Sequence, residues 1–475
     1  MKKTILTLGI GCCSSMLFAQ SQLVALTDEQ LSDVEGQALL NLTVTSPSQA
    51  NPDMQSSNIG FYKLSTNVEM ELNMNVRKLQ LGCGGVNGVG ACDIDIDYLS
   101  LSGLSDTSDG RAASSAKITN PFIEFAIKNP NSSATREVVG FRLSAEQVQG
   151  LLTAGLQNSA QPNGINSFSG YMQIQSGVGN TAAEQAKLKG FASTQAAYMD
   201  LARYPIAGKM TAIGIADVGF ETNGGGFSIP SMKNLPFETD TLVINGNRKT
   251  STSLVATVNI PTINLGVGSS YPSDGRVTYN PNDPYQTTTA VYTAGTPVNA
   301  QITGCSSPLT LGVACLVAPT GREFSSIRMQ GSVQGAQAQV NFQEALGFVH
   351  NIQLNSAFSL SLQKEQVRWP GAVDDNIAQP GWWMSVADPI SIGAVIPEEL
   401  LSIEPLLGQF AMQAGNYLQQ YPAQTNDIVS ILTGTNLDAN IGTIRPTDPL
   451  MMNLSNLQLK GQDFAPNCFG GYKFC

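Results

Sequence analysis

The sequence predicts a mainly β protein, with long antiparallel strands in an elongated or curved sheet or sandwich and a few short helices. Three observations support this prediction. Two apolar alternations within Asn67–Gly103 align as a hairpin, charged residues make up only 13% of 475 residues, and six of the eight cysteines form three close couples. Low charge with abundant glycine and uncharged polar residues is typical of exported β-rich chains, and 42% hydrophobic residues are enough for a core.

The hairpin prediction starts from Cys83 and Cys92, which flank a Gly-rich connection. If these two residues are opposed, the same register places Leu79 opposite Ile96 and pairs other apolar residues across the strands. Apolar residues that face each other in this way are expected on one side of a sheet.

Both strands of this hairpin change the parity of their apolar positions at the same level. The change falls at Arg77–Lys78 in the first strand and at Asp97–Tyr98 in the second. Since residues of a strand alternate between two faces, the pattern predicts that the buried face changes sides there.

The first residues indicate export. Residues 1–19 have the features of a signal peptide, with Lys2 and Lys3, an apolar stretch and a cleavage position after Ala19. A lipoprotein anchored at Cys12 is the alternative. No later stretch approaches the roughly 18 continuous apolar residues of a membrane helix, so none is expected in the mature chain. The net charge of −11, without clusters of Lys and Arg, argues against nucleic acid as a partner.

Residues 20–40 form a leader-like segment with a short helix. Thr27 and Gln30 have the spacing of a capping box, and Gly36 can end the helix. The same string is similar to double-glycine leader peptides, which a C39-type peptidase cleaves, although Gln37 replaces the last glycine. Cleavage between Gly36 and Gln37 is therefore an alternative to cleavage at Ala19 alone.

Residues 41–265 form an N-terminal β region. In Pro121–Lys128, Ile123 and Phe125 alternate with Glu124. This pattern predicts a strand whose apolar side is buried and whose charged side is exposed to solvent. Ser144 and Gln147 have capping-box spacing, so a helix is expected near 144–155.

The remaining chain divides into two further parts. Residues 266–321 are rich in Gly, Ser, Thr, Pro and Asn and are expected to form a disulfide-stapled loop insertion. Residues 322–475 form a C-terminal β region with a helical segment at 397–420, which Pro405 should interrupt.

The cysteines are expected to form three local disulfides, which implies an oxidising compartment. Local pairing is the simplest of the fifteen connectivities that six cysteines allow. Free thiols or a metal site are the alternatives, but no couple has zinc-site spacing and the chain has one histidine, so we expect no metal and no cofactor. The expected couples are Cys83 with Cys92, Cys305 with Cys315, and Cys468 with Cys475.

Few residues suggest chemistry. Asp93, Asp95 and Asp97 share one face of a strand, where a solvated face is favoured over a calcium site. His350 is the single histidine, so a nucleophilic triad could be built only around it, and a structural role is favoured. The motifs G-x-S-x-G and G-x-G-x-x-G are absent. We therefore do not expect an enzyme.

Three tryptophans are the best candidates for a surface contact. Trp369, Trp382 and Trp383 lie close together in sequence, and such tryptophans can form a patch for a glycan or an apolar partner. Core positions are the alternative, and the one that we favour.

Several strings together resemble the FilA-type pilus-system proteins of Gram-negative bacteria. The resemblance is strongest over residues 25–155, and it implies other pilus-system or envelope proteins as partners, among them a C39-type peptidase. The strings are ALTDEQLSDVEGQ, NVRKLQLGCGGVNGVGACDIDIDYLSLSG, TNPFIEFAIKNP and REVVGFRLSAEQVQGLLTAG.

The function expected from these features is that of an exported structural or adhesive component of a pilus-like or cell-surface system, at the cell surface or in the periplasm. The first alternative is a periplasmic β-protein that binds a lipid or another apolar ligand. The second is an outer-membrane β-barrel, which the 7% aromatic content disfavours.

Overall fold

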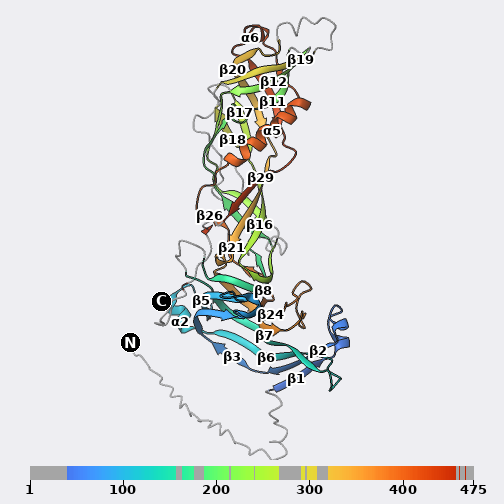
Figure 1. Ribbon diagram of the computed structural model, residues 1–475. Coiled ribbons are helices and arrows are strands. Elements are labelled where there is room, and N and C mark those ends of the chain that lie inside the picture. The colour runs from blue at the N-terminus through green and yellow to red at the C-terminus, as the bar shows by residue number, and fades with distance from the viewer. Residues whose placement is uncertain are drawn as a thin grey trace, which may run out of the picture.

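The computed structural model shows an elongated, mainly β protein in which three sheets follow one another along the molecule (Figure 1). The structure describes residues 40–156, 163–175, 187–212, 216–239, 241–266, 290–294, 297–306, 319–455, 459–460 and 466. The expected signal peptide with Ala19, the leader-like segment up to residue 39 with Gly36 and Gln37, and the cysteines at 315, 468 and 475 lie outside these residues.

The first sheet lies at one end of the molecule, and 13 strands of the described residues belong to it. The strand β7 is central because it pairs with β6, β22, β23 and β5. The strands are β1 Leu40–Thr45, β2 Ile59–Thr66, β3 Glu69–Leu72, β4 Met74–Leu81, β5 Ile94–Ser102, β6 Ala116–Lys128, β7 Glu137–Thr153, β8 Ile165–Gln175, β15 Leu242–Lys249, β22 Asn351–Ser356, β23 Phe358–Gln363, β24 Gly381–Val386 and β25 Ile390–Ser391.

Two further sheets continue the molecule away from the first (Figure 1). The five-stranded sheet contains β9 Leu188–Ala192, β14 Leu235–Thr239, β16 Ser251–Asn259, β21 Gln337–Ala345 and β29 Leu450–Ser455. The eight-stranded sheet contains β11 Ala207–Ala212, β12 Ala216–Gly224, β17 Thr262–Gly266, β18 Ala290–Ala294, β19 Val298–Ser306, β20 Glu323–Val333, β27 Ala423–Thr425 and β28 Asp438–Ile444. Two short pairs join β10 Ala197–Asp200 with β13 Gly226–Ile229, and β26 Ile396–Pro397 with β30 Leu459–Lys460.

The helices among the described residues are short, apart from α5 Glu404–Gln420. The other two α-helices in these residues are α2 Ser108–Ala113 and α6 Ile428–Thr433. The 3-10 helices are η2 Pro47–Gln49, η3 Gln55–Ser57, η4 Gly85–Asn87 and η5 Leu346–Phe348. The helix α5 buries Leu407, Ala411, Ala414 and Leu418, at the three- and four-residue spacing of one helix face. Among the described residues, no helix is long and apolar enough to cross a bilayer.

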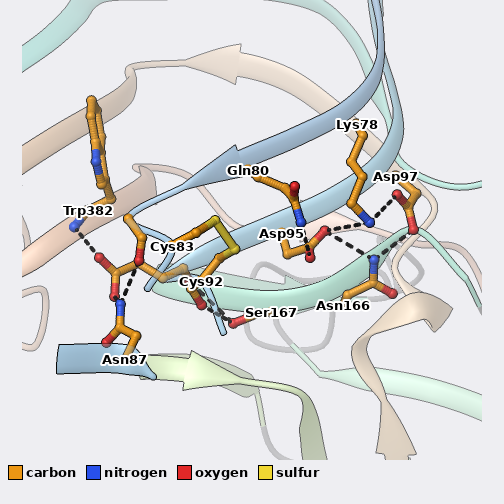
Figure 2. The surroundings of a disulfide bond; sticks show 12 residues. Lys78, Gln80, Cys83, Asn87, Cys92, Asp95, Asp97, Asn166, Ser167 and Trp382 are labelled. Carbon is orange, nitrogen blue, oxygen red and sulfur yellow. Dashed lines mark hydrogen bonds and ion pairs between the residues drawn. A yellow bond between two sulfur atoms is a disulfide. The ribbon is translucent and has the colours of Figure 1, made fainter. Parts of the chain in front are cut away.

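The predicted hairpin is confirmed in register and in its disulfide. Cys83 and Cys92 are bonded (Figure 2). Leu79 is paired with Ile96, and the other apolar pairs follow. At the expected change of parity, Tyr98 has a φ of +51°, a left-handed conformation that is uncommon outside glycine. This residue turns β5 between its two neighbours, β8 before it and β7 after it.

The buried apolar residues of β5 change parity at this point, from Ile94 and Ile96 to Leu99 and Leu101. Ile96 before the change and Leu99 after it belong to the same large hydrophobic core. Beyond the change, β5 is covered on both faces, since Ser100 and Ser102 are also fully buried. Both apolar runs of β5 therefore reach the same core, and the second run is also buried on its polar side.

A buried arginine covers the polar face of β5. Arg111 of α2 is fully buried and donates hydrogen bonds to Ser102 Oγ at 2.8 Å, Thr153 Oγ1 at 2.8 Å and the Pro466 carbonyl at 2.7 Å. Burial lowers the pKa of Arg111 to about 10, so the guanidinium stays charged at neutral pH. The contact with Pro466 connects this late residue with the first sheet.

Two predicted helical segments need correction. The helix expected near 144–155 is wrong, because these residues complete the 17-residue strand β7. Ser144 caps no helix, and its hydroxyl donates to the Phe358 carbonyl at 3.0 Å. Strand partners on both sides of β7 outweigh the local helix signal. The helical segment expected at 397–420 begins only at Glu404, and Pro405 stands in its first turn, where proline is favoured, and does not interrupt it.

The three large sheets do not correspond to the predicted successive regions of the sequence. The stretch 266–321, expected to be a loop insertion, contributes β18 and β19 to the eight-stranded sheet. Strands from 41–265 and from 322–475 meet in all three large sheets, as β7 with β23, β16 with β21 and β11 with β27 show.

Candidate functional site

One side of the first sheet is apolar and uncovered. Successive strands place Leu42, Leu64, Ile123 and Leu143 directly opposite one another in one row. Residues opposed across neighbouring strands point to the same side of a sheet. The large apolar and aromatic side chains on this side, which we call the apolar face, are Leu40, Leu42, Val44, Tyr62, Leu64, Ile123, Phe125, Phe141, Leu143, Leu360 and Leu362.

The apolar face is unusually large for an exposed surface. Eight of its eleven side chains are more than a third exposed, from 36% for Ile123 to 65% for Leu42. At about 150–200 Å² for each fully exposed residue of this size, the face offers on the order of 700 Å² of apolar surface. The largest such patch on an ordinary monomer is about 300–600 Å², and larger ones mark binding sites.

The apolar face is continuous with the main core and carries no charge. Leu360, which pairs with Leu143, packs against that core, as does Trp382, which pairs with Leu362. The side of the sheet that packs against the main core therefore continues onto the outer strands, where no other element covers it. No Asp, Glu, Lys or Arg belongs to the face as defined.

The opposite side of β2, β6, β7 and β23 is largely packed. Phe61, Val139, Trp369 and Trp383 form a second core there, together with Ala50, Met54 and Val367 from the segments that pack over it. Within this side, Arg142 Nε donates to Glu124 Oε2 at 3.0 Å, and the two side chains are 10% and 3% exposed. Burial raises the pKa of Glu124, against the opposing effect of Arg142, and burial lowers the pKa of Arg142.

This arrangement reverses the expectation for Pro121–Lys128. The strand is present, but Glu124 is buried and Phe125 is 39% exposed. Alternation along a strand indicates that its two faces differ, and it cannot say which face receives a cover. The signal that could have located the apolar face is the parallel alternation in Leu40–Thr45 and Ile59–Thr66, which places apolar side chains beside those of β6.

The tryptophan patch considered as a surface contact is not formed. Trp369 and Trp383 are 4% and 2% exposed, and the indole nitrogen of Trp383 donates to Asn376 Oδ1 at 3.0 Å. Trp382 is half-buried against the main core. The core alternative is confirmed for Trp369 and Trp383.

The aspartates at the hairpin make structural hydrogen bonds (Figure 2). Asp93 is buried and accepts from Asn87 Nδ2 at 2.9 Å and from the Trp382 backbone amide at 3.0 Å. Burial opposes ionisation of Asp95, but hydrogen bonds from Gln80 and Asn166 outweigh it, so the pKa of Asp95 is lowered. The expected solvated face is therefore only partly solvated.

The other residues considered for chemistry also have structural roles. His350 is buried, and its Nδ1–H donates to the Ala154 carbonyl at 2.7 Å. Cys305 is disulfide-bonded, and its expected partner lies outside the described residues. Within the described ranges, no group of three or more His, Cys, Asp or Glu side chains could hold a metal ion.

A second feature is an apolar cavity of about 80 Å³ where the five-stranded sheet meets the eight-stranded sheet and α5. Its walls include Phe227, Ala338, Val340 and Phe410. The polar side chain among them, Thr194, uses its hydroxyl oxygen to accept from the Met232 amide at 3.0 Å. An apolar cavity of this kind stays dry and can take an apolar guest.

Comparisons of the chain with protein-family models, curated protein sequences and solved structures found no match.

Proposed function

We propose that this chain is an exported, non-enzymatic structural component of a pilus-like or cell-surface assembly, and that its apolar face binds another protein chain of that assembly. The observation that carries the proposal is the apolar face itself. About 700 Å² of uncharged surface, continuous with the core, is close to the roughly 800 Å² that one partner contributes to a standard protein interface.

The shape of the molecule supports a structural role. The apolar face belongs to the sheet at one end, and the two other sheets extend away from it (Figure 1). A partner bound at this end would leave the rest of the molecule free to reach outward. Binding through a hydrophobic centre without charges is typical of long-lived interfaces.

The test replaces Leu64 or Phe125 by aspartate in the Gram-negative host. Both side chains are exposed, so the fold should tolerate the change, while a charge in the centre of an interface should prevent binding. We expect the chain to disappear from the fraction that shearing releases from intact cells, with unchanged total amount and melting temperature. Val255→Asp is the matched control, since Val255 is 49% exposed on β16 of another sheet.

Two results would contradict the proposal. The aspartate variants could appear in the sheared fraction at the wild-type level. The Val255→Asp control could also be lost to the same extent, which would show that the loss does not depend on the apolar face.

The cavity supports a second candidate function, the binding of a lipid or another apolar ligand. All but one of the cavity-lining side chains are apolar, so the part of a ligand that enters the cavity would be a hydrocarbon segment. The protein purified from cells should then bind the fluorescent fatty acid cis-parinaric acid, and Ala338→Leu, which fills the cavity, should abolish that binding. Equal binding by both proteins would count against this candidate.

A further inference from the structure

The strand β1 is an open sheet edge. Among the described residues β1 pairs only with β2, and five of its six residues are exposed, which includes both faces of the strand. Leu40, Leu42 and Val44 are 54%, 65% and 48% exposed. The outer edge of β1 is therefore open to solvent at the lower margin of the molecule in Figure 1.

This edge has none of the features that normally prevent strand pairing. Its sequence, LNLTVT, contains no charge, no proline and no glycine. The pairing of β1 with β2 runs without a bulge over all six residues. Folded proteins usually protect an edge with lysine, proline, a bulge or a cover, and an edge without them is a template for another strand.

The sequence of this edge is complementary to itself. When a second β1 lies antiparallel with Leu42 opposite Leu42, Leu40 faces Val44 and Asn41 faces Thr43. Apolar side chains then meet apolar ones and polar meet polar. A register shifted by one residue would place Leu42 opposite Thr43 and would mix the two faces.

We propose that a second copy of this chain adds its own β1 to this edge, in the antiparallel register with Leu42 on the two-fold axis. The pair joins the two first sheets into one and merges the two apolar faces into a single surface. This inference rests on the proposed function, because it makes a dimer with a doubled apolar face the unit that the assembly uses. The symmetric, isologous contact closes on itself and produces no fibre.

The dimer should be reversible. Each copy contributes about six residues to the edge, against the roughly 20–30 per side of a standard interface. Backbone hydrogen bonds and three pairs of apolar side chains hold it together, as in other cases of strand addition. We therefore expect monomer and dimer to exchange with concentration.

The experiment adds one cysteine at a time to the whole mature chain. Leu42→Cys should give a disulfide-linked dimer under mild oxidation, because residues opposed across an antiparallel pair lie within disulfide range. Thr43→Cys is the matched control and should give no such dimer, since Thr43 faces Asn41. Mixing Asn41→Cys with Thr43→Cys should restore the crosslink, and peptide mapping should identify its two residues.

A second variant tests the pairing without a crosslink. Val44→Lys places a charge on the edge and should convert the dimer to monomer in sedimentation equilibrium, at concentrations where the wild type is dimeric. Equal crosslinking at positions 42 and 43, no crosslink at 42, or a wild-type chain that stays monomeric would each overturn the inference.

The result separates this inference from the proposed function. If the Leu42 crosslink fails while Leu64→Asp still removes the chain from the sheared fraction, another strand or the preceding residues occupy the edge, and only the inference fails. If the crosslink forms and Leu64→Asp has no effect in cells, the proposed function fails.

Discussion

The buried pair of Glu124 and Arg142 allows a quantitative test of how the first sheet is held together. Arg142→Met removes the guanidinium and leaves the Glu124 carboxylate, of which 3% is exposed, without its cationic partner. The guanidinium also lies 5.1 Å from the ring of Trp369 and donates to the Pro370 carbonyl at 3.1 Å, so the pair lies within the second core.

The expected cost is about 3–5 kcal/mol in the free energy of unfolding, because one charge stays buried when its partner is lost. Replacing both residues, as in Glu124→Leu with Arg142→Met, should cost far less, since an apolar pair of similar volume needs no compensation. The control Lys364→Met breaks an ion pair with Glu137 whose side chains are 71% and 48% exposed, and should cost at most about 1 kcal/mol.

The destabilisation should depend on pH. Burial raises the pKa of Glu124 above its ordinary value of 4.5, and loss of Arg142 raises it further, because Arg142 opposes the effect of burial. A group whose pKa is raised in the folded state loses its contribution to stability as the pH rises through that raised pKa. The deficit of Arg142→Met should therefore be full at pH 7 and should shrink as the pH falls towards 4.5.

Urea unfolding followed by tryptophan fluorescence is the appropriate assay, since all three tryptophans lie in or against the first sheet. The wild type, the two variants and the control are compared at pH 7 and at pH 4.5. The reasoning would be refuted if Arg142→Met cost no more than Lys364→Met, or if its deficit were the same at both pH values.

Two more predictions concern the hairpin and the cavity. Replacing Cys83 and Cys92 by serine should lower the free energy of unfolding by about 2–3 kcal/mol, the chain-entropy effect for a short closed loop, and reductant should lower the wild type to the same value. Ala338→Leu should raise the free energy of unfolding by about 1 kcal/mol because it fills the cavity, whereas Ala256→Leu, at a fully buried position outside the cavity lining, should lower it by about 1–3 kcal/mol. Urea unfolding measures both, and a loss of stability in Ala338→Leu would mean that the cavity cannot accept the side chain.

The accuracy of sequence-based prediction differed between local and distant contacts. The hairpin of β4 and β5 was predictable in register because its two strands are neighbours in sequence and the cysteines align them. The strand β7 was mistaken for a helix in its second half, because its partners β22 and β23 lie about two hundred residues further on. Local capping signals are strong within a few residues, but pairing on both edges of a strand outweighs them.

The sequence alone determined that apolar and polar residues alternate, that strands close in sequence pair, and that the fold is mainly β. These properties follow from the spacing of side chains along one strand. Only the tertiary structure decided which side of each strand is buried. The side of β6 with Glu124 is covered and the side with Phe125 is open, since Ala50, Met54 and the segment around Val367 pack on the first side and nothing in the described residues covers the second. The apolar face therefore arises from where the covering elements end, a property of the whole fold that no single strand carries.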